Sequence, residues 1–221
     1  MYQTILFDLD GTITDSREGI TKSVQYALAT IGIYEEDLSK LECFIGPPLR
    51  DSFCMFYKDD INESNVEEIV AKYREHFEPK GIFQNKVYDG IPELLKTLKE
   101  NKKKLALASS KPEVFVRRIL EHFSLVQYFD VIVGSLLDGT RENKPEIVAE
   151  ALHQLFGEHP DFEHTAMVGD RKFDIEGAKN QHVTAIGVQY GFCSPGELEE
   201  AGADFIAETV FDLEEILLRK E

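Results

Sequence analysis

The sequence has few cysteines, no long apolar run and no excess of basic residues. Its three cysteines, Cys43, Cys54 and Cys193, form no CxxC pair, so we expect neither a disulfide framework nor a zinc site. This pattern favours a reducing, cytoplasmic setting. No apolar run approaches the ~20 residues of a membrane span, and the first residues lack the basic and long apolar regions of a signal peptide. No membrane association is expected.

The deficit of basic residues also bears on partners. The chain of 221 residues has 24 Lys and Arg against 41 Asp and Glu, which gives a net charge of −17. Such a chain repels nucleic-acid phosphates, and no stripe of basic and aromatic residues offsets this. The longest basic run, residues 102–104, is predicted to end a helix, where cations suit the helix dipole. Nucleic acid is therefore not expected as a partner. Hydrophobic residues make up 43% of the chain, enough for a folded core.

Short apolar runs alternate with segments of helical periodicity through most of the chain. The runs are predicted strands at residues 4–7, 105–108, 131–133, 165–168, 184–188 and 205–207. Strands that alternate with helices favour a parallel sheet covered on both faces. We therefore predict a doubly wound, mostly parallel, Rossmann-like α/β fold.

One long segment interrupts this alternation. About eighty residues separate the first strand from the next strand-bearing unit, and they contain apolar residues at helical spacing, for example Ile20, Val24, Leu28 and Ile31. We predict a helical domain at residues 15–86, inserted into a core domain of residues 1–14 and 87–221. Two connections to the core suit a hinged lid.

Polar residues gather where the predicted strands end. The carboxyl ends of the strands in a doubly wound sheet line the ligand crevice. The residues there are Asp8 and Asp10 after the first strand, Ser109 and Ser110 after the second, Lys144 beyond the third, and Asp170 and Asp174 beyond the fourth. Four carboxylates in one crevice repel each other, which a divalent cation such as Mg²⁺ would relieve. With Mg²⁺ and Lys144 present, an aspartate could attack a phosphorus atom and form an aspartyl-phosphate.

These residues resemble the four motifs of the haloacid dehalogenase-like hydrolases. The motifs are Asp8-Leu9-Asp10-Gly11-Thr12, then Ser109, then Lys144-Pro145, then the segment from Gly169-Asp170 to Asp174. Their order and spacing match, and the insertion falls where that family has its helical cap. Within the family, the chain is most similar to the phosphoglycolate phosphatase-like branch, which also contains nucleotidases, pyrophosphatases and phosphosugar mutases.

The resemblance implies a role for each motif residue. Asp8 would be the nucleophile, and Asp10 would protonate the leaving group and then activate water. The metal would be bound by Asp8, Asp10 through its carbonyl, Asp170 and Asp174. Ser109 and Lys144 would hold the transferred phosphoryl group, with Thr12 and Ser110 beside the substrate. Asp10 also disfavours a halogenated substrate, because dehalogenases of the family lack it. The implied function is a Mg²⁺-dependent phosphatase of small phosphorylated metabolites, acting as a monomer or homodimer.

Other interpretations remain open. Each motif alone also suits a structural role, such as Asp170 as a helix N-cap. Arg50, in a stiff loop with Pro47 and Pro48, could contact the substrate or pair with Asp51 or another neighbour. The same motifs would serve a phosphosugar mutase. A signalling receiver or a binding protein that accepts a phosphate without turnover is a further alternative.

Overall fold

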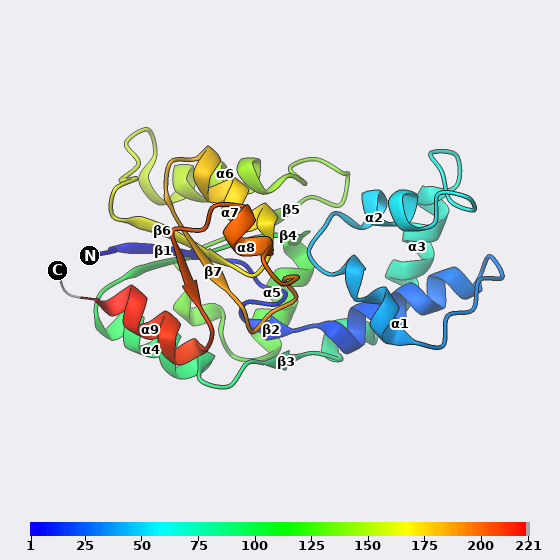
Figure 1. Ribbon diagram of the computed structural model, residues 1–221, viewed down its shortest axis with the longest axis horizontal. Coiled ribbons are helices and arrows are strands. Elements are labelled where there is room, and N and C mark those ends of the chain that lie inside the picture. The colour runs from blue at the N-terminus through cyan, green and yellow to red at the C-terminus, as the bar shows by residue number, and fades with distance from the viewer. Residues whose placement is uncertain (220–221) are drawn as a thin grey trace. The chain divides into compact units, whose positions relative to one another are not determined.

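The computed structural model describes residues 1–219 and divides the chain into two compact units (Figure 1). One unit joins Met1–Thr14 to the chain from Val87 onward, and the other is Asp15–Lys86. The chain passes between them at β2 (Thr14–Asp15) and β3 (Lys86–Val87), two short strands that pair with each other.

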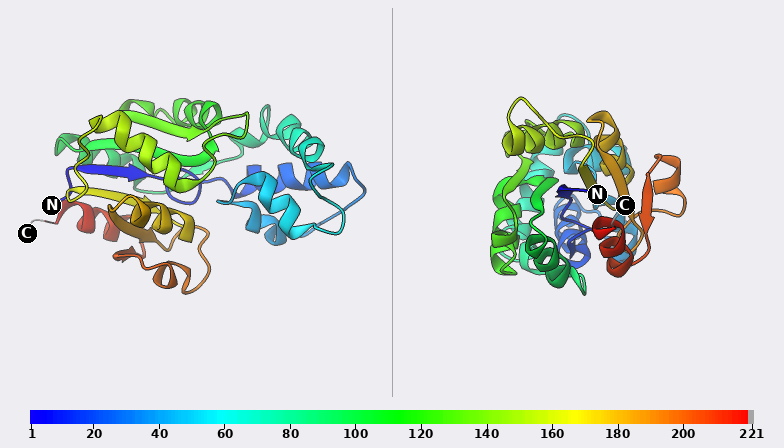
Figure 2. Two further views of the ribbon diagram at one scale, coloured as in Figure 1. Left: turned by 90° about the horizontal axis from the view of Figure 1, so that it is seen from above. Right: turned by 90° about the vertical axis from the view of Figure 1, so that its left-hand side faces the viewer.

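A six-stranded parallel sheet forms the centre of the first unit, in the order β5-β4-β1-β6-β7-β8. Figure 2 (left) shows β1 between β4 and β6. The strands are β1 (Thr4–Phe7), β4 (Lys104–Pro112), β5 (Val131–Ser135), β6 (Thr165–Gly169), β7 (Thr184–Val188) and β8 (Phe205–Ala207). All four residues of β1 are buried, which is why the sequence there is a continuous apolar run instead of an alternating one.

Helices cover both faces of this sheet, so the predicted doubly wound fold is confirmed. In Figure 1, α6 and α7 lie on one side of the sheet, and α4 and α9 lie on the other. The helices are α4 (Ile91–Glu100), α5 (Glu113–His122), α6 (Lys144–Phe156), α7 (Lys172–Asn180), α8 (Glu197–Glu200) and α9 (Val210–Leu218), with a short 3₁₀ turn, η3 (Val126–Tyr128). Leu6 of β1 and Met167 of β6 pack with Ile147 of α6 and Ile175 of α7 in one buried cluster.

The basic run at residues 102–104 lies at the C-terminal end of α4, as predicted, just beyond the last helical residue. Helix α4 ends at Glu100, and Lys102 then adopts a left-handed backbone conformation with φ of 59°. The Lys103 amide donates to the carbonyl of Leu98, and its side chain is buried and donates to the carbonyl of Tyr2. Lys104 already belongs to β4. The run therefore forms the turn between α4 and β4.

The second unit is mainly helical. Its elements are α1 (Arg17–Ala29), η1 (Leu38–Phe44), α2 (Leu49–Phe56), α3 (Val66–Phe77) and η2 (Gly81–Phe83). Ile20, Val24 and Leu28 of α1 are buried, as their helical spacing predicts. Ile31 is 38% exposed, because α1 ends before it and the chain turns away at Gly32. Within residues 1–219, none of the helices has the length and apolar character needed to cross a membrane.

Candidate active site

Three buried carboxylates meet at the carboxyl ends of β1 and β6. Asp8 follows β1, Asp170 follows β6, and Asp174 lies in the first turn of α7. One oxygen atom from each lies within 4.8 Å of the others. The two strands are paired, with Phe7 beside Val168, so both chains leave the sheet at the same level. The convergence of Asp8, Asp170 and Asp174 is the geometry that the strand ends predict.

Lys144 is a buried cation within this cluster. Its Nζ lies 2.8 Å from Asp8 Oδ1 and 2.7 Å from Asp174 Oδ1, and it donates to the carbonyl of Ala108 at 3.1 Å. Lys144 is the first residue of α6, followed by Pro145, which is favoured in a first turn. Burial lowers the pKa of Lys144, but the charges of Asp174 and Asp8 outweigh burial and raise the pKa overall. Lys144 therefore stays protonated.

The negative charge of the three carboxylates exceeds the positive charge of Lys144. Burial raises the pKa of Asp8 to about 6, against the attraction of Lys144 and with a further contribution from Asp174. The pKa of Asp170 is also raised, by burial and by the charges of Asp174 and Asp8. When ionised, the three carboxylates of the cluster and one ammonium leave two negative charges uncompensated. A hard divalent cation with oxygen ligands fits this donor set.

The loop after β1 approaches Asp170 closely. Thr12 Oγ1 lies 3.5 Å from Asp170 Oδ1, and the Phe192 amide donates to Asp170 Oδ2 at 2.7 Å. Gly11 has φ of 86°, and a Cβ atom at this position would lie 2.0 Å from Asp170 Oδ2. Only glycine combines this backbone conformation with so close an approach. The Asp-Gly turn thus lets the loop pass directly over Asp170.

Asp10 does not join the three-carboxylate cluster through its side chain. Its Oδ2 pairs with Lys111 Nζ at 2.7 Å, and both side chains are less than 10% exposed. Its Oδ1 is buried and has no hydrogen-bond partner among the described residues. Lys111 was not singled out from the sequence, although it follows Ser109 and Ser110 within β4. Strand-end reasoning places Lys111 beside Ser109 but does not identify Asp10 as its partner.

Ser109, Ser110 and Thr12, which were also predicted to lie at the site, have different surroundings. Ser109 is buried in β4 beside Gly134 of β5, and its Oγ accepts a long hydrogen bond, 3.4 Å, from the Lys111 amide. The Ser110 carbonyl accepts from Ser135 Oγ at 2.8 Å. Thr12 is fully buried beside Asp170.

Arg50 lies in the second unit and is bound by two glutamates of that unit. Its Nε donates to Glu67 at 2.9 Å, and its terminal nitrogens pair with Glu63. Neither partner is Asp51, the neighbour named from the sequence. Both glutamates are more than 70% exposed, so these ion pairs are open to solvent.

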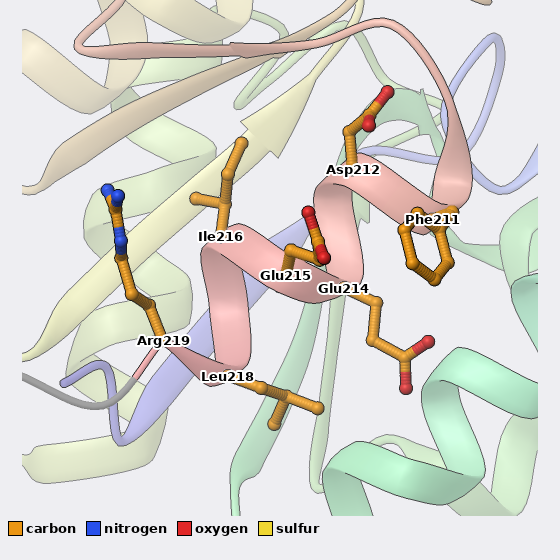
Figure 3. Close-up of a pocket in the computed structure, with 7 residues that line it drawn as sticks. All are labelled: Phe211, Asp212, Glu214, Glu215, Ile216, Leu218 and Arg219. Atoms are coloured by element: carbon orange, nitrogen blue, oxygen red, sulfur yellow. The ribbon is translucent and has the colours of Figure 1, made fainter.

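A surface pocket on α9 is separate from this cluster (Figure 3). The side chains that line the pocket point away from the helix in different directions, as Figure 3 shows. They are Phe211, Asp212, Glu214, Glu215, Ile216, Leu218 and Arg219. None belongs to the predicted site, and they present no nucleophile with an adjacent base. The chemistry is therefore expected at the strand ends.

Comparisons with known proteins show which family this chain is similar to. A profile of the family described as "Haloacid dehalogenase-like hydrolase" matches residues 5–188. A 5'-nucleotidase of Pseudomonas aeruginosa is 51% identical over 197 residues, which cover 89% of this chain and 87% of that protein. The tyrosine-protein kinase PtkA of Mycobacterium tuberculosis is 37% identical over 97% of this chain and 72% of its own length. A crystal structure described as a predicted phosphatase, from Clostridium acetobutylicum, is 46% identical with a TM-score of 0.94, and all of both chains is covered.

Proposed function

The chain belongs to the haloacid dehalogenase-like hydrolase family, and from that premise we propose that it is a Mg²⁺-dependent phosphatase. Its substrates would be small phosphate monoesters, hydrolysed through an aspartyl-phosphate on Asp8. The observation that carries the proposal is the buried cluster of Asp8, Asp170 and Asp174 with Lys144 bound to two of its members.

Asp8, Asp170 and Asp174 would hold the cation, together with the Asp10 carbonyl. The excess of two negative charges and the raised pKa values of Asp8 and Asp170 support this assignment, because a divalent cation offsets both. When bound, Mg²⁺ would neutralise charge between the carboxylates and the phosphate and polarise a phosphoryl oxygen.

Asp8 and Asp10 would divide the reaction between them. An Asp8 oxygen attacks phosphorus, and the bond from phosphorus to the leaving oxygen breaks as Asp10 gives its proton to that oxygen. Water then attacks the phosphorus of the aspartyl-phosphate and loses a proton to Asp10, which frees Asp8 and inorganic phosphate. Lys144 and Ser109 would hold the phosphoryl oxygens that carry negative charge. Lys111 would neutralise the Asp10 carboxylate between the two steps, after Asp10 has given up its proton and before water returns one.

The inserted unit, Asp15–Lys86, would act as the cap that selects the substrate. Phosphoglycolate and nucleoside 5'-monophosphates are the proposed substrate types, both from the motif resemblance, and the name of the Pseudomonas relative supports the second. Arg50 is the residue of this unit that we propose for substrate contact. Its guanidinium would have to leave Glu63 and Glu67 to bind an anionic group of the substrate.

The test is phosphate release from a panel of esters, with and without Mg²⁺. We expect release with Mg²⁺, none with a chelator, and none from Asp8→Asn. Glu176→Gln is the matched control, because Glu176 is an exposed carboxylate on α7, the helix that carries Asp174. Full activity of Asp8→Asn would rule out Asp8 as the nucleophile.

A second candidate function is transfer of the phosphoryl group to a hydroxyl instead of to water. The relative named as a tyrosine-protein kinase supports this candidate, because a tyrosine kinase transfers a phosphoryl group to a hydroxyl. A phosphosugar mutase would use the same motifs. ³¹P NMR of the products separates the two. Hydrolysis yields inorganic phosphate, whereas transfer yields a new phosphate ester without stoichiometric release.

A further inference from the structure

Asp170 differs from the other two carboxylates of the cluster in how it is held. Lys144 pairs with Asp8 and Asp174, whereas the hydrogen bonds that the described residues give Asp170 come from neutral donors. These are the Phe192 amide at 2.7 Å and the Thr12 hydroxyl at 3.5 Å. The orientation of Asp170 before a cation arrives therefore depends on the segments that carry Phe192 and Thr12.

Both segments meet at Tyr190. Its hydroxyl donates to the carbonyl of Thr12 at 3.1 Å, and Phe192 follows two residues later. Thr12 is fully buried, so its carbonyl needs a partner within the protein. Burial and the nearby charge of Asp170 raise the pKa of Tyr190, so the phenol keeps its proton and can donate at neutral pH.

Gly191, between Tyr190 and Phe192, lets this segment approach Asp170 closely. A Cβ atom on Gly191 would lie 2.3 Å from Asp170 Cβ and 2.5 Å from the Gly11 carbonyl oxygen. Gly191 therefore packs closely against both Asp170 and the loop after β1. The Tyr190 ring is itself fixed by an edge contact with Tyr88, with the ring centres 5.0 Å apart.

We propose that Tyr190 is a positioning residue for the cation site. It ties the loop that follows the nucleophile to the segment that orients Asp170. Without its hydroxyl, the Thr12 carbonyl loses its donor, the loop shifts, and Asp170 loses one of the two contacts that aim its oxygens. The proposal rests on the proposed function for the presence of a cation, but Tyr190, Gly191 and Phe192 belong to none of the motifs in the sequence analysis.

The test measures cation affinity without substrate. Tyr190→Phe keeps the ring against Tyr88 and removes only the hydroxyl. Free Mn²⁺ is counted by electron paramagnetic resonance in a titration of each folded protein, a signal to which tyrosine does not contribute. We expect Tyr190→Phe to bind Mn²⁺ about tenfold more weakly than the wild type, the loss corresponding to one hydrogen bond. Tyr128→Phe is the matched control, because Tyr128 lies in η3, and should bind as the wild type does.

Two further measurements separate positioning from stability alone. Saturating Mg²⁺ should restore the turnover of Tyr190→Phe, so its apparent Mg²⁺ requirement rises while kcat recovers. Gly191→Ala, which would push a methyl group against Asp170, should weaken Mn²⁺ binding in the same assay and serves if Tyr190→Phe does not fold.

Equal Mn²⁺ affinity of Tyr190→Phe and the wild type would overturn the proposal and leave the proposed function intact. If the wild type binds Mn²⁺ but hydrolyses no ester, the positioning role still stands or falls on the Mn²⁺ titrations. If the wild type binds no Mn²⁺, both the cation site and the positioning role are wrong.

Discussion

Replacing Asp8 by Asn should abolish turnover and, unusually for an active-site change, stabilise the cation-free protein. The pKa of Asp8 is raised by burial to about 6 from its ordinary 3.8, so its ionised form is disfavoured in the folded state. A difference of this size corresponds to roughly 3 kcal/mol of stability that the wild type lacks at neutral pH. Asparagine has nearly the same shape and carries no charge, so it should recover most of that free energy.

The difference in stability between Asp8→Asn and the wild type should depend on pH. Below about pH 4, Asp8 is protonated in both the folded and the unfolded chain, so wild type and Asp8→Asn should have equal stability. Between about pH 4 and 6, only the unfolded chain ionises Asp8, and the wild type loses stability as the pH rises. Above about pH 6 the difference should be constant.

Thermal unfolding in a chelator, followed by circular dichroism, measures the effect. We expect Asp8→Asn to unfold roughly 6–12 °C above the wild type at neutral pH. Added Mg²⁺ should close this gap, because a cation at one hundred times its Kd stabilises the wild type by about 2.7 kcal/mol and the variant by less. If Asp8→Asn is no more stable than the wild type in chelator, or if the gap persists at low pH, the electrostatic account of the cluster is wrong.

Three further changes test other parts of the site. Lys144→Met should lower turnover by a factor of roughly 10²–10³, which steady-state kinetics measures. It should also destabilise the cation-free protein by about 3–5 kcal/mol, because it leaves buried carboxylates unpaired, and denaturant unfolding measures this loss. Gly11→Ala should abolish Mn²⁺ binding, since its methyl group would collide with Asp170, and retained binding would contradict the packing described. Arg50→Ala should change the free energy of unfolding by less than about 1 kcal/mol, because its partners are exposed. A severalfold rise in KM for Arg50→Ala would support substrate contact, and an unchanged KM would confine Arg50 to the surface.

The sheet and the three-carboxylate cluster could be predicted because both depend on local pattern. Buried parallel strands read as short apolar runs, and the residue after each run must lie at the same edge of the sheet. Asp8 and Asp170 come together for this reason alone, since β1 and β6 are neighbours in the sheet. Strand β4 is longer than its apolar run, because its pairing with β5 continues beyond Ala108 through an irregularity after Ser109.

The contacts that hold the site could not be predicted, because they join distant segments through single side chains. No periodicity relates Lys111 to Asp10, or Tyr190 to Thr12, residues that lie about 100 and 180 positions apart. Glu63 and Glu67 resemble any other exposed acidic residues of the second unit until Arg50 is placed between them. Pattern therefore locates the reacting groups, and packing decides what surrounds them.

The central place of β1 in the sheet has a consequence for the order of folding. Strand β1 pairs with β4 and β6, whose residues lie about 100 and 160 positions further along the chain. Closing loops of this length costs chain entropy before any contact is gained, so pairings between such distant segments form slowly. Asp8 and Asp170 should therefore come together late in folding, once the middle of the sheet has been assembled.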